Sequence, residues 1–216
     1  MSPNQKARLA EDGESRRALK ILTALKQLFP HPKTILNYAT PFELLVAVIL
    51  SARNTDKKVN EVTEKLFVKY TTPKDYANAN LNELEKDLGK LGLFRQKSKF
   101  IKETARIIVD KHEGKIPKTM NELIELPGVG RKTANIILGN VHGIIEGIAV
   151  DTHVTRLSKL FRLTKNKDPN KIEQDLMKLL PRDEWFDLTN RMIAYGRKYC
   201  PAHCKHTTCP LKNYIV

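Results

Sequence analysis

Small and basic residues gather in one short segment of the chain, LPGVGRKTAN at 126–135. Gly128 and Gly130 allow backbone conformations that are closed to other residues, and they let the loop approach another backbone closely. A helical pattern follows the loop, so free N–H groups at the helix start would point outward and bind phosphate. With Arg131 and Lys132 beside it, the segment predicts a helix-hairpin-helix that holds a nucleic-acid backbone without reading bases. An ordinary corner between two helices is the alternative.

Helical periodicity runs through the chain and must supply the elements that position this loop. Leucines at 19, 22, 25 and 28 recur at spacings of three, as on one face of a helix. Thr40 and Pro41 have the types of an N-cap and a first helical residue, which favours a buried helix for the apolar run at 41–50. No segment shows sustained strand alternation, so we expect an all-α fold of about ten helices. A further helix is expected after a cap at Thr55 or Asp56, and others are expected at 80–91, 98–110, 118–126, 131–141, 152–161, 170–180 and 183–195.

The composition excludes several classes of protein. The 216 residues include 38 Lys and Arg against 24 Asp and Glu, a formal net charge of +14 that favours a polyanionic partner. Basic clusters at 90–106 and 191–216 are expected to face that partner. The longest unbroken apolar run, Leu44–Leu50, is far shorter than the roughly 20 residues of a membrane span. We expect an intracellular monomer, cytoplasmic or nucleoid-associated, whose 3 cysteines fit a reducing compartment.

The hairpin segment and VDTHVTR at 150–156 together resemble the endonuclease III family of helix-hairpin-helix DNA glycosylases. HPKTILNYATPFELLVAVILSARNTD matches the N-terminal half of the family and MIAYGRKYC its C-terminal end, so the resemblance covers nearly the whole chain. It implies two α-helical lobes. One is a six-helix lobe over 34–144 that ends in the hairpin, and the other joins 1–33 with 145–216. It also implies a partner, duplex DNA that carries a damaged pyrimidine or an abasic site.

The resemblance implies a bifunctional enzyme of base excision repair. It would remove oxidised pyrimidines as a DNA glycosylase and cut the strand by β-elimination as an abasic-site lyase. The nucleophilic lysine of the family falls on Lys132 and its carboxylate on Asp151. The amine would displace the flipped-out base at C1′ and form a Schiff base. Taken singly, an Asp at a helix start is most often a cap. A non-catalytic helical DNA-binding protein and a glycosylase for mismatched or deaminated bases are the alternative functions.

Further positions are assigned to DNA binding by motif. Leu93 in GLFRQK matches the apolar wedge that props the base stack open, with a core leucine as the alternative. Arg53 in SARNTD stands in the loop that fills the vacated space, where the family usually has Gln. His153 is expected to pack, with a phosphate contact as the alternative. The positions assigned in the hairpin are Gly128, Val129, Gly130, Arg131 and Thr133.

The C-terminal cysteines depart from the pattern of the family. Members often carry a [4Fe–4S] cluster on cysteines spaced x6, x2 and x5, whereas the three cysteines here are spaced x3 and x4. Counted from Cys209 as the third ligand, the fourth position is Ile215, which cannot ligate. A cubane cluster normally takes four thiolates, so the usual cluster is disfavoured and a protein without a cofactor is our leading expectation. Zinc, or a cluster with a nitrogen ligand, is the alternative, on Cys200, Cys204 and Cys209 with His206 or His203.

Overall fold

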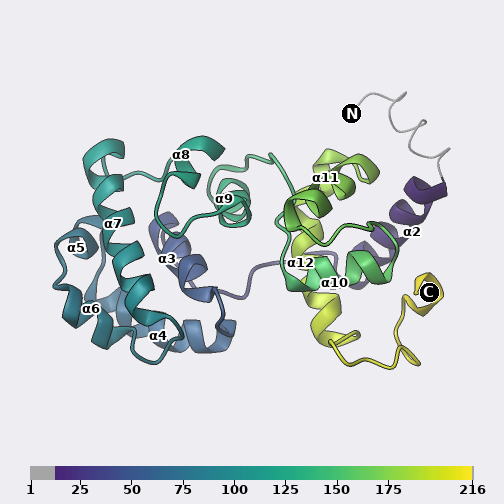
Figure 1. Ribbon diagram of the computed structural model, residues 1–216, viewed down its shortest axis with the longest axis horizontal. Coiled ribbons are helices and arrows are strands. Elements are labelled where there is room, and N and C mark those ends of the chain that lie inside the picture. Colours follow the sequence, from purple (N-terminus) through teal and green to yellow (C-terminus); the bar gives the residue numbers. More distant parts are fainter. Residues whose placement is uncertain (1–12, 216) are drawn as a thin grey trace. The chain divides into compact units, whose positions relative to one another are not determined.

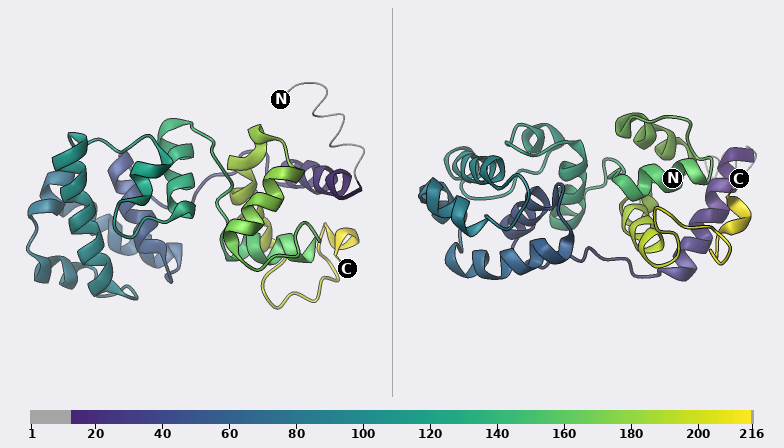
Figure 2. Two further views of the ribbon diagram at one scale, coloured as in Figure 1. Left: turned by 45° about the horizontal axis from the view of Figure 1, so that its top comes forward. Right: turned by 60° about the horizontal axis from the view of Figure 1, so that its bottom comes forward.

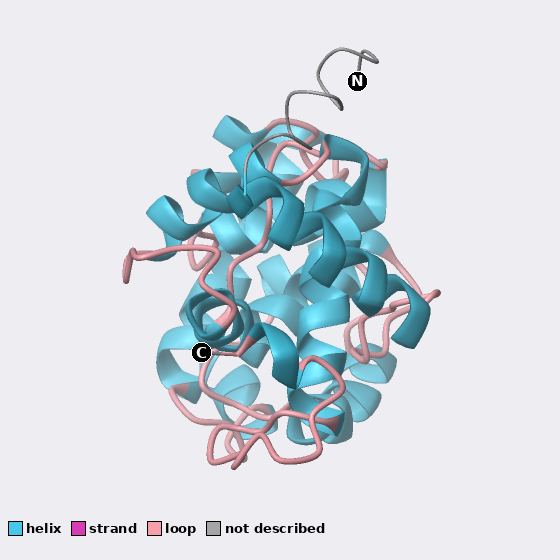
Figure 3. Ribbon diagram, turned by 90° about the vertical axis from the view of Figure 1, so that its right-hand side faces the viewer, coloured by secondary structure: helices cyan, strands magenta, loops and turns pink. Residues whose placement is uncertain are grey.

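Helices and loops make up the whole of residues 13–215, the part of the chain that the computed structural model describes (Figure 1). Figure 3 shows no strand within these residues, which confirms the predicted all-α fold. No helix among the described residues has the length and apolar content needed to cross a membrane. The α-helices are α2 (Gly13–Leu28), α3 (Pro41–Ser51), α4 (Asp56–Lys69), α5 (Pro73–Asn78), α6 (Leu81–Asp87), α7 (Phe94–His112), α8 (Met120–Ile124), α9 (Arg131–Ile137), α10 (Thr152–Leu160), α11 (Pro169–Leu179) and α12 (Trp185–Lys198). A π turn η1 (Leu138–His142) and two 3₁₀ turns, η2 (Arg182–Glu184) and η3 (Lys212–Tyr214), complete the list.

The described residues divide into two compact units. One unit is Ile35–Ile144, and the other combines the segment up to Thr34 with the segment from Ile145 onward. Each unit has its own cluster of buried apolar side chains. Each unit is therefore a compact structure with a core of its own.

Helix α3 is the central element of the unit Ile35–Ile144. Its start has a capping box: the Thr40 hydroxyl accepts from the Glu43 N–H, while the Glu43 carboxylate accepts from the Thr40 N–H. Pro41 follows as the first helical residue, as the sequence predicts. All residues of the run Leu44–Leu50 are buried, since α3 contacts α4, α7 and α9 (Figure 2). Helix α3 therefore packs against α9, which follows the predicted hairpin, and against α7, which follows the loop of Leu93.

The other unit is built on α2, α10, α11 and α12. Helix α10 contacts α11 and α12, and α2 contacts α11 and α12. The predicted leucine face of α2 is buried at Leu22 and Leu25. Cys200, Cys209 and Leu211 of the C-terminal segment belong to the same core. That segment is therefore packed onto the helices as part of the unit.

Candidate active site and DNA-contacting residues

The loop at 125–130 joins α8 to α9, and the two helices contact each other, which confirms the predicted helix-hairpin-helix. Gly128 has a φ of +79°, a conformation that residues with side chains rarely adopt. A Cβ atom here would lie 2.8 Å from Cδ2 of Phe100, so the loop also lies directly against α7. Thr104 of α7 donates its hydroxyl to the carbonyl of Pro127 at 2.9 Å. Helix α7 therefore holds the loop in place.

Two positions of the hairpin differ from their sequence interpretation. Gly130 has φ −98° and ψ 176°, an extended conformation that any residue can adopt. Of the two positions, only 128 therefore has a backbone conformation that requires glycine. A Cβ on Gly130 would meet no atom within 4 Å, which leaves open space beside the backbone at the start of α9. The sequence predicts a DNA contact for Val129, but its side chain is buried and its N–H donates to the Leu126 carbonyl at 3.0 Å. Val129 therefore stabilises the loop from inside.

The predicted nucleophile and the predicted carboxylate each lie at the start of a helix. Lys132 is exposed in the first turn of α9, between the half-buried Arg131 and Thr133. Asp151 is the N-cap of α10, where its Oδ1 accepts from the Val154 N–H at 2.8 Å. Lys132 belongs to the unit that contains the hairpin, and Asp151 belongs to the other unit. An exposed primary amine can attack a carbon, and a carboxylate held at a helix end can stabilise positive charge.

Leu93 and Arg53 lie at the tips of two loops of the same unit, and both have left-handed backbone conformations. Leu93 is the N-cap of α7, with a φ of 60°, and is 47% exposed, which excludes the alternative of a core leucine. Arg53 follows the end of α3, has a φ of 57°, and is exposed. The N–H of Gly92 donates to Oδ1 of Asn54 at 2.9 Å. The two residues predicted to enter DNA therefore stand on directly bonded loops.

His153 is half-buried on α10 at a place where α12 comes close. A Cβ atom on Gly196 of α12 would overlap Nδ1 of His153 and would lie 3.1 Å from Nη2 of Arg156. Gly196 is part of the MIAYGRKYC motif, so this motif and VDTHVTR meet here. The contact supports the interpretation that His153 packs, and it explains why glycine is needed at position 196.

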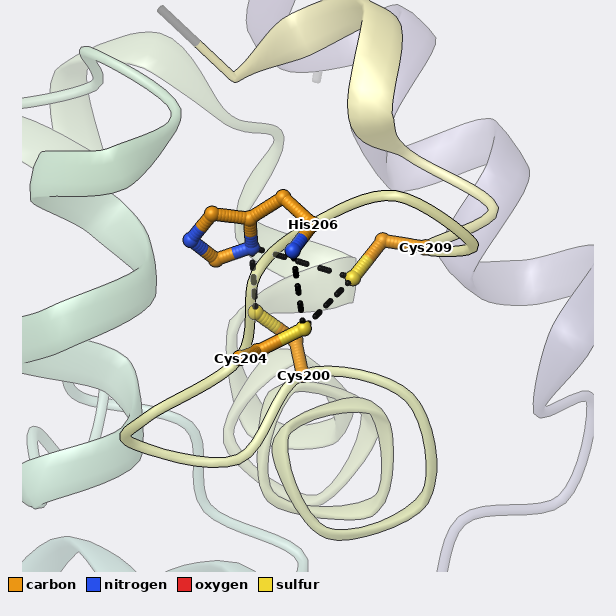
Figure 4. A group of neighbouring side chains, drawn as sticks. All are labelled: Cys200, Cys204, His206 and Cys209. Carbon is orange, nitrogen blue, oxygen red and sulfur yellow. Dashed lines mark hydrogen bonds between the residues drawn. The ribbon is translucent and has the colours of Figure 1, made fainter.

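Three cysteines and one histidine converge in the C-terminal segment (Figure 4). The ligand atoms of Cys200, Cys204, His206 and Cys209 all lie within 4.8 Å of one another. The Sγ atoms of Cys204 and Cys209 are 3.2 Å apart, and Nδ1 of His206 lies 3.5 Å from Sγ of Cys200. Burial raises the pKa of the Cys209 thiol to about 12, whereas hydrogen bonds from Cys209 and the His206 N–H lower the pKa of Cys204. Arg156 of α10 donates to the Cys200 carbonyl at 2.6 Å and so ties this segment to α10.

These four donors fit a metal centre by chemistry and by position. Thiolates and imidazoles are ligands of zinc and of iron–sulfur clusters. Counted back from Cys209 as the third ligand, the second position of the family pattern falls on His206. Cys204 falls at no position of that pattern, yet its thiol joins the group and supplies the donor that is missing at Ile215. Of the two histidines considered from the sequence, the structure brings His206 into the group.

The two basic clusters offer fewer cations to a partner than the charge count suggests. In the cluster at 90–106, Lys97 is buried and Lys102 donates to two carbonyls at the C-terminal end of α5, at 2.7 and 2.6 Å. In the cluster at 191–216, Arg191 is only 4% exposed and bonds to Glu184 at 2.7 Å and to Asp187 at 3.0 Å. These cations hold helices together and are not placed to contact phosphate.

The fold and these motifs define a class of DNA repair protein. The chain belongs to the HhH-GPD superfamily of base excision DNA repair proteins, whose profile matches residues 46–182. Its relatives include endonuclease III of Synechocystis sp., which is 46% identical over 88% of this chain and 86% of that protein. Endonuclease III of Bacillus subtilis is 42% identical over 88% of this chain and 87% of that protein. Endonuclease III of Escherichia coli K12 is 39% identical over 85% and 87%.

Solved structures lead to the same family. A non-covalent endonuclease III–DNA complex matches with a TM-score of 0.89 and 40% identity, over 93% of this chain and 94% of that chain. A trapped endonuclease III–DNA covalent intermediate matches equally well, over 93% and 95%. A thermostable thymine-DNA glycosylase, at 21% identity and a TM-score of 0.83, shares the fold. The predictions of the family, of the fold and of a base excision repair glycosylase and lyase are confirmed.

The cofactor prediction is wrong. The sequence spacing favours a protein without a cofactor and disfavours an iron–sulfur cluster, but the structure gathers Cys200, Cys204, His206 and Cys209 into one metal-ligand group. The chain also matches endonuclease III, and the members of that family often carry an iron–sulfur cluster. The spacing misled because it counts residues along the chain, whereas a ligand group depends on where the loop brings its atoms.

Several supporting residues receive no role from the sequence. Asn54 lies in SARNTD and Lys97 ends GLFRQK, and the two connect the loops that carry Arg53 and Leu93. Phe100 defines the space available to the hairpin glycine. The signal that could have found Asn54 is its position beside an expected DNA-filling residue, since Asn readily bonds backbone groups in turns. For Lys97, a charged residue in a basic cluster, the sequence points to the surface.

Proposed function

We propose that Lys132 is the nucleophile and Asp151 the charge-stabilising carboxylate of this DNA glycosylase and abasic-site lyase, which acts on oxidised pyrimidines in duplex DNA. Family membership and the endonuclease III relatives support the activity. The observation that carries the residue assignment is the exposed amine of Lys132 in the first turn of the helix that follows the hairpin. A loop that binds backbone phosphate next to this amine would bring a deoxyribose within its reach.

The reaction proceeds in two stages on a nucleotide flipped out of the duplex. The neutral amine of Lys132 bonds to C1′ while the glycosidic bond breaks, and the base leaves with the electron pair and takes up a proton. The sugar ring opens as the Schiff base forms. A proton is then lost from C2′ and the bond from C3′ to its oxygen breaks, with the phosphate as leaving group. Asp151 stabilises the positive charge that develops on the sugar and accepts the proton of the attacking amine.

The remaining predicted residues bind the duplex. The N–H groups at the start of α9, with the side chains of Arg131 and Thr133, hold backbone phosphate beside Gly130. Leu93 enters the base stack, and Arg53 fills the space that the flipped base leaves. An enzyme with this substrate acts where the chromosome is, inside the cell.

Borohydride trapping tests the nucleophile. We expect a covalent adduct between the protein and duplexes that carry thymine glycol or an abasic site, and its loss in Lys132→Gln with DNA affinity largely kept. Lys111→Gln is the matched control, since it removes the same charge from an exposed lysine at the end of α7. An adduct that persists in Lys132→Gln would refute the assignment. An adduct at the abasic site alone would redirect the search to mismatched or deaminated bases.

Asp151→Asn tests the carboxylate without removing the helix cap, because an amide oxygen can still accept from the Val154 N–H. We expect base excision to slow by about 100-fold, the order of magnitude for loss of one electrostatic group at a reacting centre. The measurement is the single-turnover rate on a thymine-glycol duplex, with the thermal midpoint as the check on folding. An unchanged rate would leave Asp151 as a cap only.

We also infer that Cys200, Cys204, His206 and Cys209 hold a metal centre. When bound, such a centre would supply folding energy by cross-linking the C-terminal segment onto the unit. Metal analysis of the purified protein is expected to find iron or zinc in constant ratio to the chain. Visible absorption and sulfide content distinguish an iron–sulfur cluster from a single zinc ion. Cys204→Ser should lose the metal and His203→Ala should keep it; retention of the metal in Cys204→Ser would refute the ligand set.

A further inference from the structure

The two loops predicted to enter DNA share an unusual backbone. Arg53 and Leu93, at their tips, both have positive φ angles, of 57° and 60°. A residue other than glycine in this region costs of order 1–3 kcal/mol and persists only where its surroundings enforce it. Something in the surrounding structure must therefore hold both tips, and the contacts beneath them show what does so.

Lys97 is the first part of this connection. It lies in the first turn of α7, one turn after Leu93, and is only 3% exposed. Its ammonium group donates to the carbonyls of Leu50 at 2.8 Å and Ala52 at 2.5 Å. Both carbonyls belong to the end of α3, where backbone acceptors lack partners within the helix and favour a cation. Burial lowers the pKa of Lys97 to about 8, in keeping with its removal from water. The start of α7 is thus fastened to the end of α3.

Asn54 is the second part, and it contacts both loops. Its amide Nδ2 donates to the same two carbonyls, Leu50 at 2.9 Å and Ala52 at 3.2 Å. Its Oδ1 accepts from the N–H of Gly92 at 2.9 Å. Gly92 directly precedes Leu93, and Asn54 directly follows Arg53. One side chain therefore bonds the residue next to each tip.

We propose that Asn54 is a positioning residue that fixes the Leu93 wedge relative to Arg53, so that the two tips enter the duplex as one preformed unit. This inference rests on the proposed function, in which both side chains act in opening the stack. The physical reason is preorganisation. Two independent loops would each lose conformational entropy when they insert into the duplex, whereas loops that are bonded to each other have already lost it on folding.

A comparison of two substrates tests the proposal. In Asn54→Ala, we expect thymine-glycol excision from a duplex to slow by about tenfold, since three side-chain hydrogen bonds are lost. Cleavage of an abasic site in a single strand should stay within about twofold of the wild type, because there is no opposite base to separate. Asn60→Ala is the matched control. Asn60 also joins two segments of this unit, through the Ile35 carbonyl and the Asn37 N–H, and its loss should leave both rates unchanged.

A double-mutant cycle shows whether Asn54 acts through the wedge. If it does, Asn54→Ala adds little in a Leu93→Ala background, whereas independent effects would multiply. The proposal would be overturned if the two substitutions acted independently, so that their rate effects multiply. It would also be overturned by an equal loss of rate on duplex and single strand, which is the result expected from general damage to the fold. Failure of the proposed function itself looks different: the wild-type protein would then give no borohydride adduct on either substrate.

Discussion

The hairpin offers a prediction in which two neighbouring glycines separate stability from DNA binding. Gly128 has a φ of +79° and faces Phe100, whereas Gly130 is extended and faces open space. The same substitution, glycine to alanine, therefore has different consequences at positions two residues apart. At Gly128 the substitution should lower the stability of the fold. At Gly130 it should instead obstruct a ligand that approaches the loop from outside.

The loss of folding free energy in Gly128→Ala is the sum of two contributions. A left-handed conformation costs an alanine about 1–2 kcal/mol relative to glycine. The new Cβ would lie 2.8 Å from Cδ2 and 3.2 Å from Cβ of Phe100. Relief of that overlap by movement of the ring or the loop costs about 1–3 kcal/mol. A total of about 3 kcal/mol would lower the thermal midpoint of a chain of this size by roughly 10 °C.

Gly130→Ala has no such cost. An alanine N-cap is weaker than glycine by several tenths of a kcal/mol, and the reduced freedom of the unfolded chain offsets a similar amount. The thermal midpoint should therefore stay within about 2 °C of the wild type. The methyl group would instead occupy the space where a phosphate approaches the backbone, so affinity for a duplex should fall about tenfold, equivalent to one lost hydrogen bond to a charged group.

Thermal unfolding and equilibrium binding to an abasic-site duplex measure both outcomes. Unfolding of Gly128→Ala at the wild-type temperature would show that a residue with a side chain fits beside Phe100, contrary to this prediction. The assignment of the phosphate site fails if Gly130→Ala binds as tightly as the wild type. A loss of stability in Gly130→Ala would show that the space beside this residue is filled.

Two further predictions concern cations that the charge count assigns to the surface. Burial lowers the pKa of Lys97 to about 8, below that of a lysine in the unfolded chain. The unfolded state therefore binds more protons above pH 8, and the stability of the wild type relative to Lys97→Met should rise from pH 8 to 10 in urea unfolding. Arg191→Met leaves Glu184 and Asp187 without their guanidinium partner and should cost about 3 kcal/mol in thermal unfolding, with unchanged DNA affinity at low temperature. Weaker DNA binding at full stability would mean that Arg191 reaches the duplex.

Much of the fold could be predicted because local signals agree with it. The Thr40-Pro41 start of α3 has the capping geometry that the residue types indicate. The short helix α5 is missing from the prediction, although Thr72, Pro73 and Asp75 form the same kind of capping box. Helix α7 begins at Phe94, four residues before the predicted start, because the left-handed Leu93 serves as its N-cap. Local patterns thus indicate that a helix exists better than where it begins.

The supporting contacts of the site could not be predicted in this way. Lys97 bonds to the Leu50 carbonyl across 47 residues, and no periodicity relates the two positions. Likewise, the sequence offers Cys200, Cys204 and Cys209 with His206 or His203 as an alternative ligand set, but the spacing alone does not decide whether these donor atoms meet. Both groups depend on the path of a loop in three dimensions. The type of a charged or metal-binding residue indicates which groups it can bind. The packing of its neighbours decides which groups it does bind.

The same distinction changes what the net charge of +14 means for DNA binding. The charges of Lys97, Lys102 and Arg191 contribute to the overall field, but their nitrogen atoms are bonded to carbonyls and carboxylates inside the protein. The salt dependence of affinity counts the phosphates that are contacted, not the total charge of the protein. A small number of contacts around the hairpin should therefore determine the salt dependence. The bonds of Lys97 instead hold the start of α7 against the end of α3, next to the loops that carry Leu93 and Arg53.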